Sequence, residues 1–260
     1  MKVGWIGLGE IGKHMALRVL DAGHDLVAYD RGAGKEEVAA KGARMTSDYA
    51  ALAAGCEALC LCLFSDAQVR DVLFDQGTLA AMQPGSVLAI HTTGSPALAR
   101  EIGERAPPGV SVLDACFSGG PHETANGDLT LMVGGDEQVL EKARPVLSTY
   151  ASRINHMGPL GAGQTLKLLN NLLFATNLMQ AAEILDIART QGLDPQFAAK
   201  VICQSSGGSM AMGLLQNGPA ELTLNAARHY MVKDVDAASE AAKDTGIDVS
   251  TFRKTLDYYR

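Results

Sequence analysis

The feature that most constrains the fold is a glycine-rich turn between an apolar run at residues 2–7 and a helix-like segment at residues 10–22. A G-x-G-x-x-G turn in this position allows a tight bend, lets a pyrophosphate approach the backbone, and lets the helix pack closely on the strand. The helix N-terminus then presents unpaired N–H groups to the phosphates. We therefore predict that a dinucleotide binds at Gly7, Leu8, Gly9, Glu10, Ile11 and Gly12.

The end of the second apolar run bears on which dinucleotide binds. Asp30 stands where the ribose-binding carboxylate of such a site belongs. Its carboxylate would accept hydrogen bonds from the ribose hydroxyls and repel a 2′-phosphate, which favours NAD. Arg31 beside it could stack on adenine or pair with that phosphate. We predict NAD as the cofactor, with NADP as the alternative, and both residues as cofactor contacts.

Apolar runs alternate with helix-like segments through the first part of the chain. Nearly continuous apolar strands that alternate with helices indicate a parallel sheet covered on both faces, with its ligand crevice at the carboxyl ends of the strands. We therefore predict a doubly wound, Rossmann-like α/β domain over residues 1–160 that binds NAD(P). The expected strands lie at residues 2–7, 25–30, 57–64, 86–91, 110–116, 129–134 and 152–157, and the expected helices at 10–22, 35–41, 48–54, 66–74, 95–105 and 136–150.

No strand pattern returns after Gly158. We place the domain boundary in the glycine-rich turn at residues 158–163 and predict an all-helical domain for substrate binding and oligomerisation over residues 161–260. Its first helix is long and apolar and offers more surface than one small domain buries, so we expect a homodimer or homotetramer. The helices are expected at residues 163–191, 195–204, 212–215, 231–245 and 249–259.

Composition and charge exclude several classes of protein. The 260-residue chain has a net charge of −7, so it lacks the surplus of Lys and Arg that nucleic-acid binding needs. No signal peptide is visible, and no stretch approaches the roughly 18 apolar residues of a membrane span, so we expect a cytoplasmic protein without membrane association. The five cysteines form no C-x-x-C pair and are expected as free thiols. The histidines lack metal-binding spacing, and no metal is predicted.

Two polar segments have residue types suited to hydride transfer. Such a reaction needs one group that takes or returns the hydroxyl proton, and another that holds a substrate carboxylate near the nicotinamide. Lys167 lies one helical turn before Asn171, so both face one side of a helix, and a lysine on an apolar face is costly unless it is paired or functional. The loop Ser118, Gly119 and Gly120 offers a hydroxyl and consecutive backbone N–H groups, which suit capture of a carboxylate.

Four segments in this order resemble the β-hydroxyacid dehydrogenase family, whose members include 3-hydroxyisobutyrate dehydrogenase and tartronate semialdehyde reductase. Four ordered motifs are far more specific than any one of them, and the resemblance runs from about residue 1 to about residue 246. The segments lie at residues 7–16, 114–135 and 158–171 and at Lys233 with Asp234.

The resemblance implies a role for each matching residue. Lys167 is then the catalytic acid/base, Asn171 orients the substrate, and residues 118–120 bind its carboxylate. Lys233 reaches back to the substrate and the cofactor. Phe64, at the end of the apolar run 57–64, and Thr93, just after the run 86–91, are implied as further cofactor contacts.

The implied activity is hydride transfer between NAD(P) and a small 3-hydroxy (or 2-hydroxy) carboxylic acid and its semialdehyde or keto form. One alternative is an imine reductase on the same scaffold, against which Lys167 counts because such enzymes generally lack a lysine there. A second is a non-catalytic cofactor-binding module. The chain departs from the family pattern at Phe117, which is bulkier than the usual valine, and the helical domain is expected to be shortened at its C-terminus.

Overall fold

A computed structural model describes residues 1–29, 32, 34–243 and 257–258. The chain divides into two compact units, Met1–Lys167 and Leu168–Arg260. The division falls inside one long helix, α9 (Ala162–Thr190), a few residues beyond the boundary expected from the sequence. The domain limits proposed from the sequence stay a prediction.

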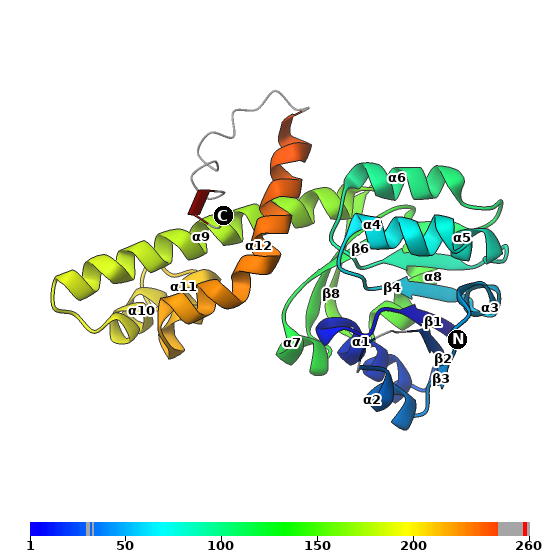
Figure 1. The fold of residues 1–260 in the computed structure, drawn as a ribbon, viewed down its shortest axis with the longest axis horizontal. Helices are drawn as coiled ribbons and strands as arrows, with labels where there is room; N and C mark the ends of the chain where they lie inside the picture. Colours follow the sequence, from blue (N-terminus) through cyan, green and yellow to red (C-terminus); the bar gives the residue numbers. More distant parts are fainter. Residues whose placement is uncertain (30–31, 33, 244–256, 259–260) are drawn as a thin grey trace. The chain divides into compact units, whose positions relative to one another are not determined.

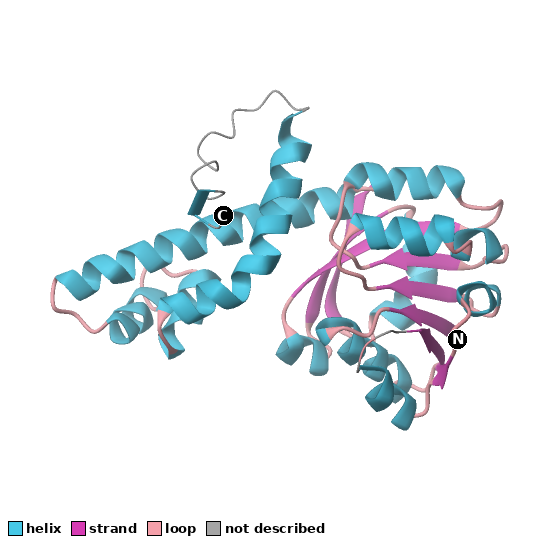
Figure 2. Ribbon diagram, in the orientation of Figure 1, coloured by secondary structure: helices cyan, strands magenta, loops and turns pink. Residues whose placement is uncertain are grey.

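The first unit is an eight-stranded sheet with helices on both faces, in the strand order β3-β2-β1-β4-β5-β6-β7-β8 (Figures 1 and 2). Its strands are β1 (Lys2–Ile6), β2 (Asp25–Tyr29), β3 (Arg44–Met45), β4 (Ala58–Leu61), β5 (Val87–Ile90), β6 (Ser111–Ser118), β7 (Leu129–Gly134) and β8 (Ala151–Gly158). The helices are α1 (Glu10–Asp21), α2 (Gly34–Ala40), α3 (Tyr49–Ala54), α4 (Asp66–Arg70), α5 (Thr78–Ala81), α6 (Pro96–Arg105), α7 (Pro121–Ala125) and α8 (Glu137–Leu147).

Two separate apolar cores lie on the two faces of this sheet. One contains buried residues of α1, α2 and α8, such as Met15, Val38 and Leu140. The other contains residues of α3 to α6, such as Leu52 and Ile102. Helices on both faces of a mostly parallel sheet confirm the doubly wound, Rossmann-like fold.

The sheet is not parallel throughout, and in this respect the sequence-based expectation is wrong. β7 pairs antiparallel with β6, whereas β8 pairs parallel with β7. Residues 119–128 join β6 to β7 and hold only the five-residue α7. A parallel return needs a crossover of a dozen or more residues, so this shorter connection leads the chain back in the opposite direction.

Several short elements escaped prediction because they are too short to show a hydrophobic period. They are β3, α5 and α7. The helix expected at residues 66–74 is instead α4 followed by a π-helical turn, Asp71–Asp75. Helix starts follow ordinary capping chemistry: the Ser95 hydroxyl accepts from the Ala97 N–H at α6, and the Asp136 carboxylate accepts from the Gln138 N–H at α8.

A buried aromatic cluster supports the carboxyl edge of the sheet. The His91 ring stacks on Trp5 at 5.9 Å between centroids, and Tyr150 meets both rings edge-on. His91 Nδ1 donates to the Ala115 carbonyl at 2.6 Å, because a carbonyl can only accept. Nε2 of the neutral ring therefore accepts from the Tyr150 hydroxyl at 3.0 Å. Trp5 Nε1 donates to the Gly7 carbonyl at 3.0 Å, which ties the cluster to the glycine turn.

This cluster predicts a pH-dependent stability. Burial lowers the pKa of His91 to about 4, against 6.5 for a free imidazole. Protonation therefore favours the unfolded chain, so the stabilisation is complete above the unfolded pKa and is lost as pH falls towards 4. Between about pH 6.5 and pH 4 we expect His91 to remove about 3 kcal/mol from the free energy of unfolding.

Urea denaturation across this pH range measures the effect. His91→Gln should be less stable than the wild type at neutral pH, because it loses the stacking, but should show a shallower loss on acidification. The exposed His122 gives the control variant His122→Asn, whose pH profile should match the wild type. Equal slopes for His91→Gln and the wild type would exclude this role for His91.

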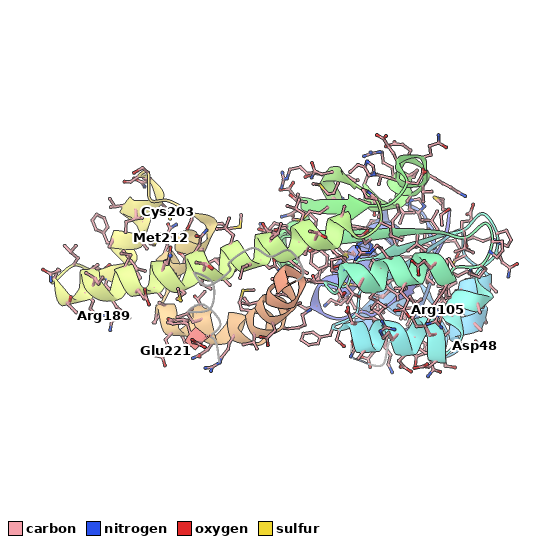
Figure 3. The ribbon with its side chains drawn as sticks, turned by 90° about the horizontal axis from the view of Figure 1, so that it is seen from above. Asp48, Arg105, Arg189, Cys203, Met212 and Glu221 are labelled. Carbon is pink, nitrogen blue, oxygen red and sulfur yellow. The ribbon has the colours of Figure 1, made fainter. Side chains whose placement is uncertain are left out.

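The second unit is helical throughout its described residues, as predicted. It contains α9 from Leu168 onwards, α10 (Pro195–Cys203), α11 (Met210–Leu214), a 3₁₀ turn (Leu215–Asn217) and α12 (Ala220–Lys243). α12 begins well before the expected start at residue 231, and the helix expected at residues 249–259 lies outside the described residues apart from 257–258. Met212 and Cys203 lie together beside the far half of α9 (Figure 3), in a core formed by α9, α10 and α11. None of the described helices has the length and apolarity to cross a bilayer.

Candidate functional site

The glycine turn has the geometry that a pyrophosphate requires. Gly7 has φ +98°, and a Cβ there would lie 2.2 Å from the Cys62 carbonyl oxygen. A Cβ on Gly12 would lie 2.2 Å from the Gly7 carbonyl oxygen, so α1 packs directly on the turn. Gly9 is different, because a Cβ there would meet nothing within 4 Å. Gly9 caps α1 without any side-chain hydrogen bond, which leaves the helix N-terminus for an anion.

The structure describes three further predicted cofactor contacts of the turn, which differ in burial. Leu8 is buried in the core, Ile11 is half-buried, and Glu10 is exposed at the start of α1. Asp30 and Arg31 lie outside the described residues, and their contacts with a ribose or a 2′-phosphate stay predictions. The turn itself fits a dinucleotide, since it combines an open glycine with an uncapped helix N-terminus.

Phe64 and Thr93 lie at the same edge of the sheet as the glycine turn. β1, β4 and β5 are parallel neighbours, so the residues that follow them share the carboxyl edge. The Leu63 N–H donates to the Thr92 hydroxyl at 2.8 Å, which joins the two loops, and both Phe64 and Thr93 are half-buried. This placement puts Phe64 and Thr93 at the same carboxyl edge of the sheet as the glycine turn.

The loop after β6 differs in one respect from the predicted carboxylate trap. Ser118 ends β6, and Gly119 adopts φ +131°. The Gly120 N–H, however, already donates to the Glu123 carboxylate at 2.8 Å. Hydrogen bonds from the Glu123 backbone N–H and from the Gly120 N–H lower the pKa of Glu123. In this structure Ser118 and Gly119 are therefore the groups of this loop that remain suited to a carboxylate.

Lys167 extends from α9 towards the end of β6. Its Nζ lies 5.8 Å from the centre of the Phe117 ring, at the outer limit of a cation–π contact, and the residue is half-buried. The start of α9 is fixed by Asp114 on β6, whose carboxylate accepts from the Gly161 N–H at 2.7 Å and the Gln164 N–H at 2.6 Å. Burial raises the pKa of Asp114, although these N–H groups oppose the shift.

In the second unit, Asp234 links the two other predicted substrate residues. Asn171 Nδ2 donates to Asp234 Oδ2 at 2.5 Å. Lys233 Nζ lies 3.3 Å from Asp234 Oδ1 as an ion pair, with a geometry outside that of a hydrogen bond. Asp234 is buried, so this carboxylate fixes the Asn171 amide beside the Lys233 ammonium.

Sequence reasoning did not single out Asp114, Gln164 or Asp234 as site residues. Each stands inside one of the family-like segments; Gln164 follows Gly163, and Asp234 follows the predicted site residue Lys233. The signal that marks them is a buried polar side chain with specific hydrogen-bond partners, which only the fold reveals.

Comparisons with known proteins show the family to which the chain belongs. The profile of the NAD binding domain of 6-phosphogluconate dehydrogenase matches residues 2–158, and the profile described as NAD-binding of NADP-dependent 3-hydroxyisobutyrate dehydrogenase matches residues 161–260. The NAD-dependent L-serine dehydrogenase of Pseudomonas aeruginosa is 33% identical over an alignment of 271 residues that covers 100% of this chain and 91% of the relative.

Solved structures show the same relationship. Mycobacterium tuberculosis 3-hydroxyisobutyrate dehydrogenase, solved with L-serine, has a TM-score of 0.88 at 30% identity and covers 99% of this chain and 92% of its own. An imine reductase of Streptomyces aurantiacus has a TM-score of 0.72 at 21% identity, with 100% and 93% covered. The imine reductase alternative therefore rests on a shared fold alone.

The fold, the glycine turn and these matches define an NAD(P)-dependent oxidoreductase. Within that class, the chain belongs to the β-hydroxyacid dehydrogenase family. The family, the fold and the cofactor class expected from the sequence are confirmed. The roles of individual residues stay predictions. Among the described residues, no group of three or more His, Cys, Asp or Glu side chains could hold a metal ion.

Proposed function

We propose that the protein oxidises a short 3-hydroxy carboxylic acid to its semialdehyde, or catalyses the reverse reaction, with Lys167 as the general acid/base. The observation that carries this proposal is the position of Lys167, whose Nζ lies beside Phe117 at the same sheet edge as the glycine turn. A nicotinamide cofactor bound at the glycine turn would supply the acceptor for the hydride of the alcohol carbon. A neutral Lys167 amine takes the proton from the alcohol oxygen as the carbonyl forms, and returns it in the reverse direction.

The other residues hold the substrate in place. Ser118 and Gly119 donate to its carboxylate, and Asn171 with Lys233 fixes its orientation, which lowers the barrier by positioning. The names of two relatives include L-serine, which is itself a 3-hydroxy acid. We therefore place L-serine and 3-hydroxyisobutyrate first among the substrates to test.

Turnover is followed through the absorbance of the reduced nicotinamide, with a panel of short hydroxy acids and a panel of cyclic imines. We expect turnover with at least one 3-hydroxy acid and none with the imines. Tight cofactor binding without turnover of any hydroxy acid would contradict the proposal. It would favour the non-catalytic module, whereas turnover of imines alone would favour the imine reductase.

We infer that NAD is preferred over NADP, because Asp30 in the sequence provides a carboxylate that repels a 2′-phosphate. The ratio of kcat/KM for the two cofactors measures this preference. Asp30→Ser should shift the ratio towards NADP. A wild-type ratio that favours NADP would overturn the inference and point to Arg31 as the phosphate contact.

Asp234 provides a test of the substrate-orienting residues. Asp234→Ala leaves Asn171 Nδ2 without its acceptor, and we expect kcat/KM for the hydroxy acid to fall by roughly 10²-fold. Asp234→Asn keeps an acceptor oxygen but loses the charge opposite Lys233, so a fall of about tenfold is expected. The partial rescue by asparagine separates orientation of Asn171 from general damage to α12. Glu221→Gln, an exposed substitution on the same helix, is the control. Unchanged kinetics in both Asp234 variants would rule out the role.

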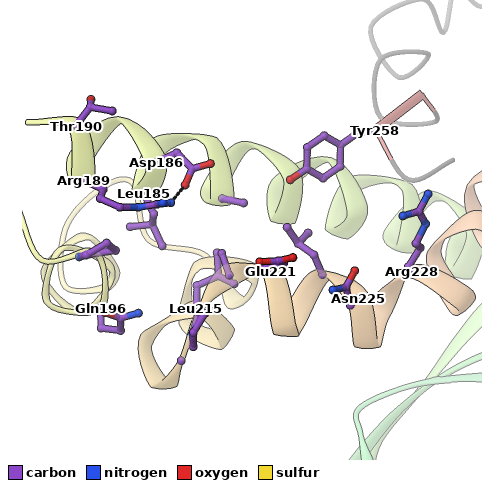
Figure 4. Close-up of a pocket in the computed structure, with 16 residues that line it drawn as sticks. Leu185, Asp186, Arg189, Thr190, Gln196, Leu215, Glu221, Asn225, Arg228 and Tyr258 are labelled. Carbon is purple, nitrogen blue, oxygen red and sulfur yellow. Dashed lines mark hydrogen bonds and ion pairs between the residues drawn. The ribbon is translucent and has the colours of Figure 1, made fainter.

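We also propose a homodimer or homotetramer. α9 and α10 expose large apolar side chains, among them Ile187 at 56% and Phe197 at 66%. A groove of about 760 Å³ lies within the second unit (Figure 4). None of its lining residues is a predicted site residue; they include Leu185, Arg189, Leu215 and Leu224. Sedimentation equilibrium should give a multiple of the chain mass, and Phe197→Glu should lower it, whereas a wild-type monomer would contradict the proposal.

We propose a cytoplasmic location. Cys56 and Cys60 are buried cysteines outside any disulfide, which suits a reducing compartment. Burial raises the pKa of Cys56 to about 11, so its thiol is protonated and unreactive. Cell fractionation tests the location, and recovery outside the cytoplasmic fraction would contradict it.

A further inference from the structure

Gln164 stands on the first turn of α9, one helical turn before Lys167. It is 2% exposed, and both ends of its amide are used. Nε2 donates to the Thr92 carbonyl at 2.8 Å, and Oε1 accepts from the Gly94 N–H at 2.8 Å. The side chain therefore binds the backbone on both sides of Thr93.

The partners of Gln164 are themselves fixed. Asp114 accepts from the Gln164 N–H and so holds the start of α9 against β6. On the other side of the loop, the Asp66 carboxylate accepts from the Ser95 N–H at 3.0 and 3.2 Å. A Cβ on Gly94 would clash with Asp66 Oδ1, so the loop lies directly against that carboxylate. Gln164 thus joins two rigid elements through one side chain.

We propose that Gln164 is a positioning residue that sets the place of Lys167 relative to the loop carrying Thr93. The proposal deepens the proposed function, on which it rests, because it assumes that Lys167 and Thr93 both act at the nicotinamide end of the cofactor. An apolar side chain of similar volume would fill the same space, but it would not fix the register between helix and loop. A displacement of a catalytic group by about 1 Å is enough to lower the rate by about 10²-fold, so a change in the register between α9 and the loop should reduce turnover.

Glutamate at this position provides a specific test. A protonated Gln164→Glu carboxyl donates to the Thr92 carbonyl and accepts from the Gly94 N–H, as the amide does. The ionised carboxylate has no donor and places an oxygen against the Thr92 carbonyl oxygen, which is repulsive. Asp66 lines the same small cavity as Gln164, and the Asp114 carboxylate accepts from the Gln164 N–H; Lys167 lies three residues further along α9. The defect should therefore disappear as pH falls and the introduced carboxyl takes up a proton.

The first readout is amide hydrogen exchange at Gly94 in the protein without cofactor. Gln164→Met removes the acceptor, so exchange at Gly94 should accelerate by at least about tenfold. Gln164→Glu keeps an acceptor for the Gly94 N–H in both protonation states, so its exchange at Gly94 should stay closer to the wild type than that of the methionine variant, when each is compared with the wild type at the same pH. Gln138→Met and Gln138→Glu, at an exposed glutamine in the first turn of α8, are the matched controls.

The second readout is turnover with the best hydroxy acid of the panel. Gln164→Met should lower kcat by roughly 10²-fold while the Kd for NAD changes by less than about threefold. The kcat of Gln164→Glu relative to wild type should rise as pH falls. Unchanged exchange at Gly94, or a folded Gln164→Met with a kcat within about threefold of wild type, would overturn the proposal. Failure of the proposed function would look different, because Lys167→Ala would then retain turnover while the exchange at Gly94 still depended on residue 164.

Discussion

Replacement of Lys167 by alanine should lower kcat by roughly 10²–10⁴-fold, because this is the usual contribution of a general acid or base. The kcat of Lys167→Met should fall by the same factor. Methionine keeps an unbranched side chain beside Phe117 but cannot carry the proton, so equal losses separate proton transfer from packing. Single-turnover measurements of the hydride-transfer step would show that the loss is chemical.

Two measurements distinguish this role from a merely structural one. The Kd for NAD should change by less than about threefold in both variants, because Lys167 is not placed among the cofactor contacts. A small primary amine in solution should restore part of the activity of Lys167→Ala, since it supplies the missing base. Lys200→Ala, at an exposed lysine of α10, should behave as wild type. A kcat for Lys167→Ala within about tenfold of wild type would assign the proton transfer to another group.

The fold was largely predictable because its signals are local. Apolar runs and helical periods follow directly from the burial of a sheet on both faces, and all seven expected strands are present. The direction of β7 was not predictable from its own residues, because an apolar strand has the same pattern in either direction. The length of the connection at residues 119–128 held that information. Likewise, the two-residue β3 is too short to produce any pattern.

The sequence revealed the glycines of the predicted site more fully than its polar residues. Glycines of the turn carry their constraint in the backbone, so their spacing alone indicated a phosphate site. The amide and carboxylate partners are different, because their meaning depends on residues far away in the chain. Gln164 contacts Thr92, and Asp234 contacts Asn171, across sequence separations of 72 and 63 residues. Gly120 is a further example. The sequence predicted that its N–H binds a substrate carboxylate, but in the structure this N–H donates to the Glu123 carboxylate.

The glycine turn allows cofactor binding to be separated from folding by two alanine substitutions. A Cβ on Gly9 meets no protein atom within 4 Å, and Gly9 has an ordinary φ of −63°. Gly9→Ala should therefore leave the stability of the cofactor-free protein unchanged, while its methyl group takes the space that a pyrophosphate needs. We expect the Kd for NAD to rise by about 10²-fold, which corresponds to about 2.7 kcal/mol.

Gly12→Ala should have the opposite profile. Its Cβ would lie 2.2 Å from the Gly7 carbonyl oxygen, a backbone atom that cannot swing aside. The clash should lower the free energy of unfolding by about 1–3 kcal/mol in the protein without cofactor, as overpacking does. Thermal unfolding and NAD titration of both variants measure the two effects. If Gly9→Ala bound NAD as tightly as the wild type, the pyrophosphate would not lie over Gly9. The stability loss in Gly12→Ala would then report only the packing of α1 on the turn. The two variants together therefore distinguish a turn that binds a pyrophosphate from a turn that only allows α1 to pack on the sheet.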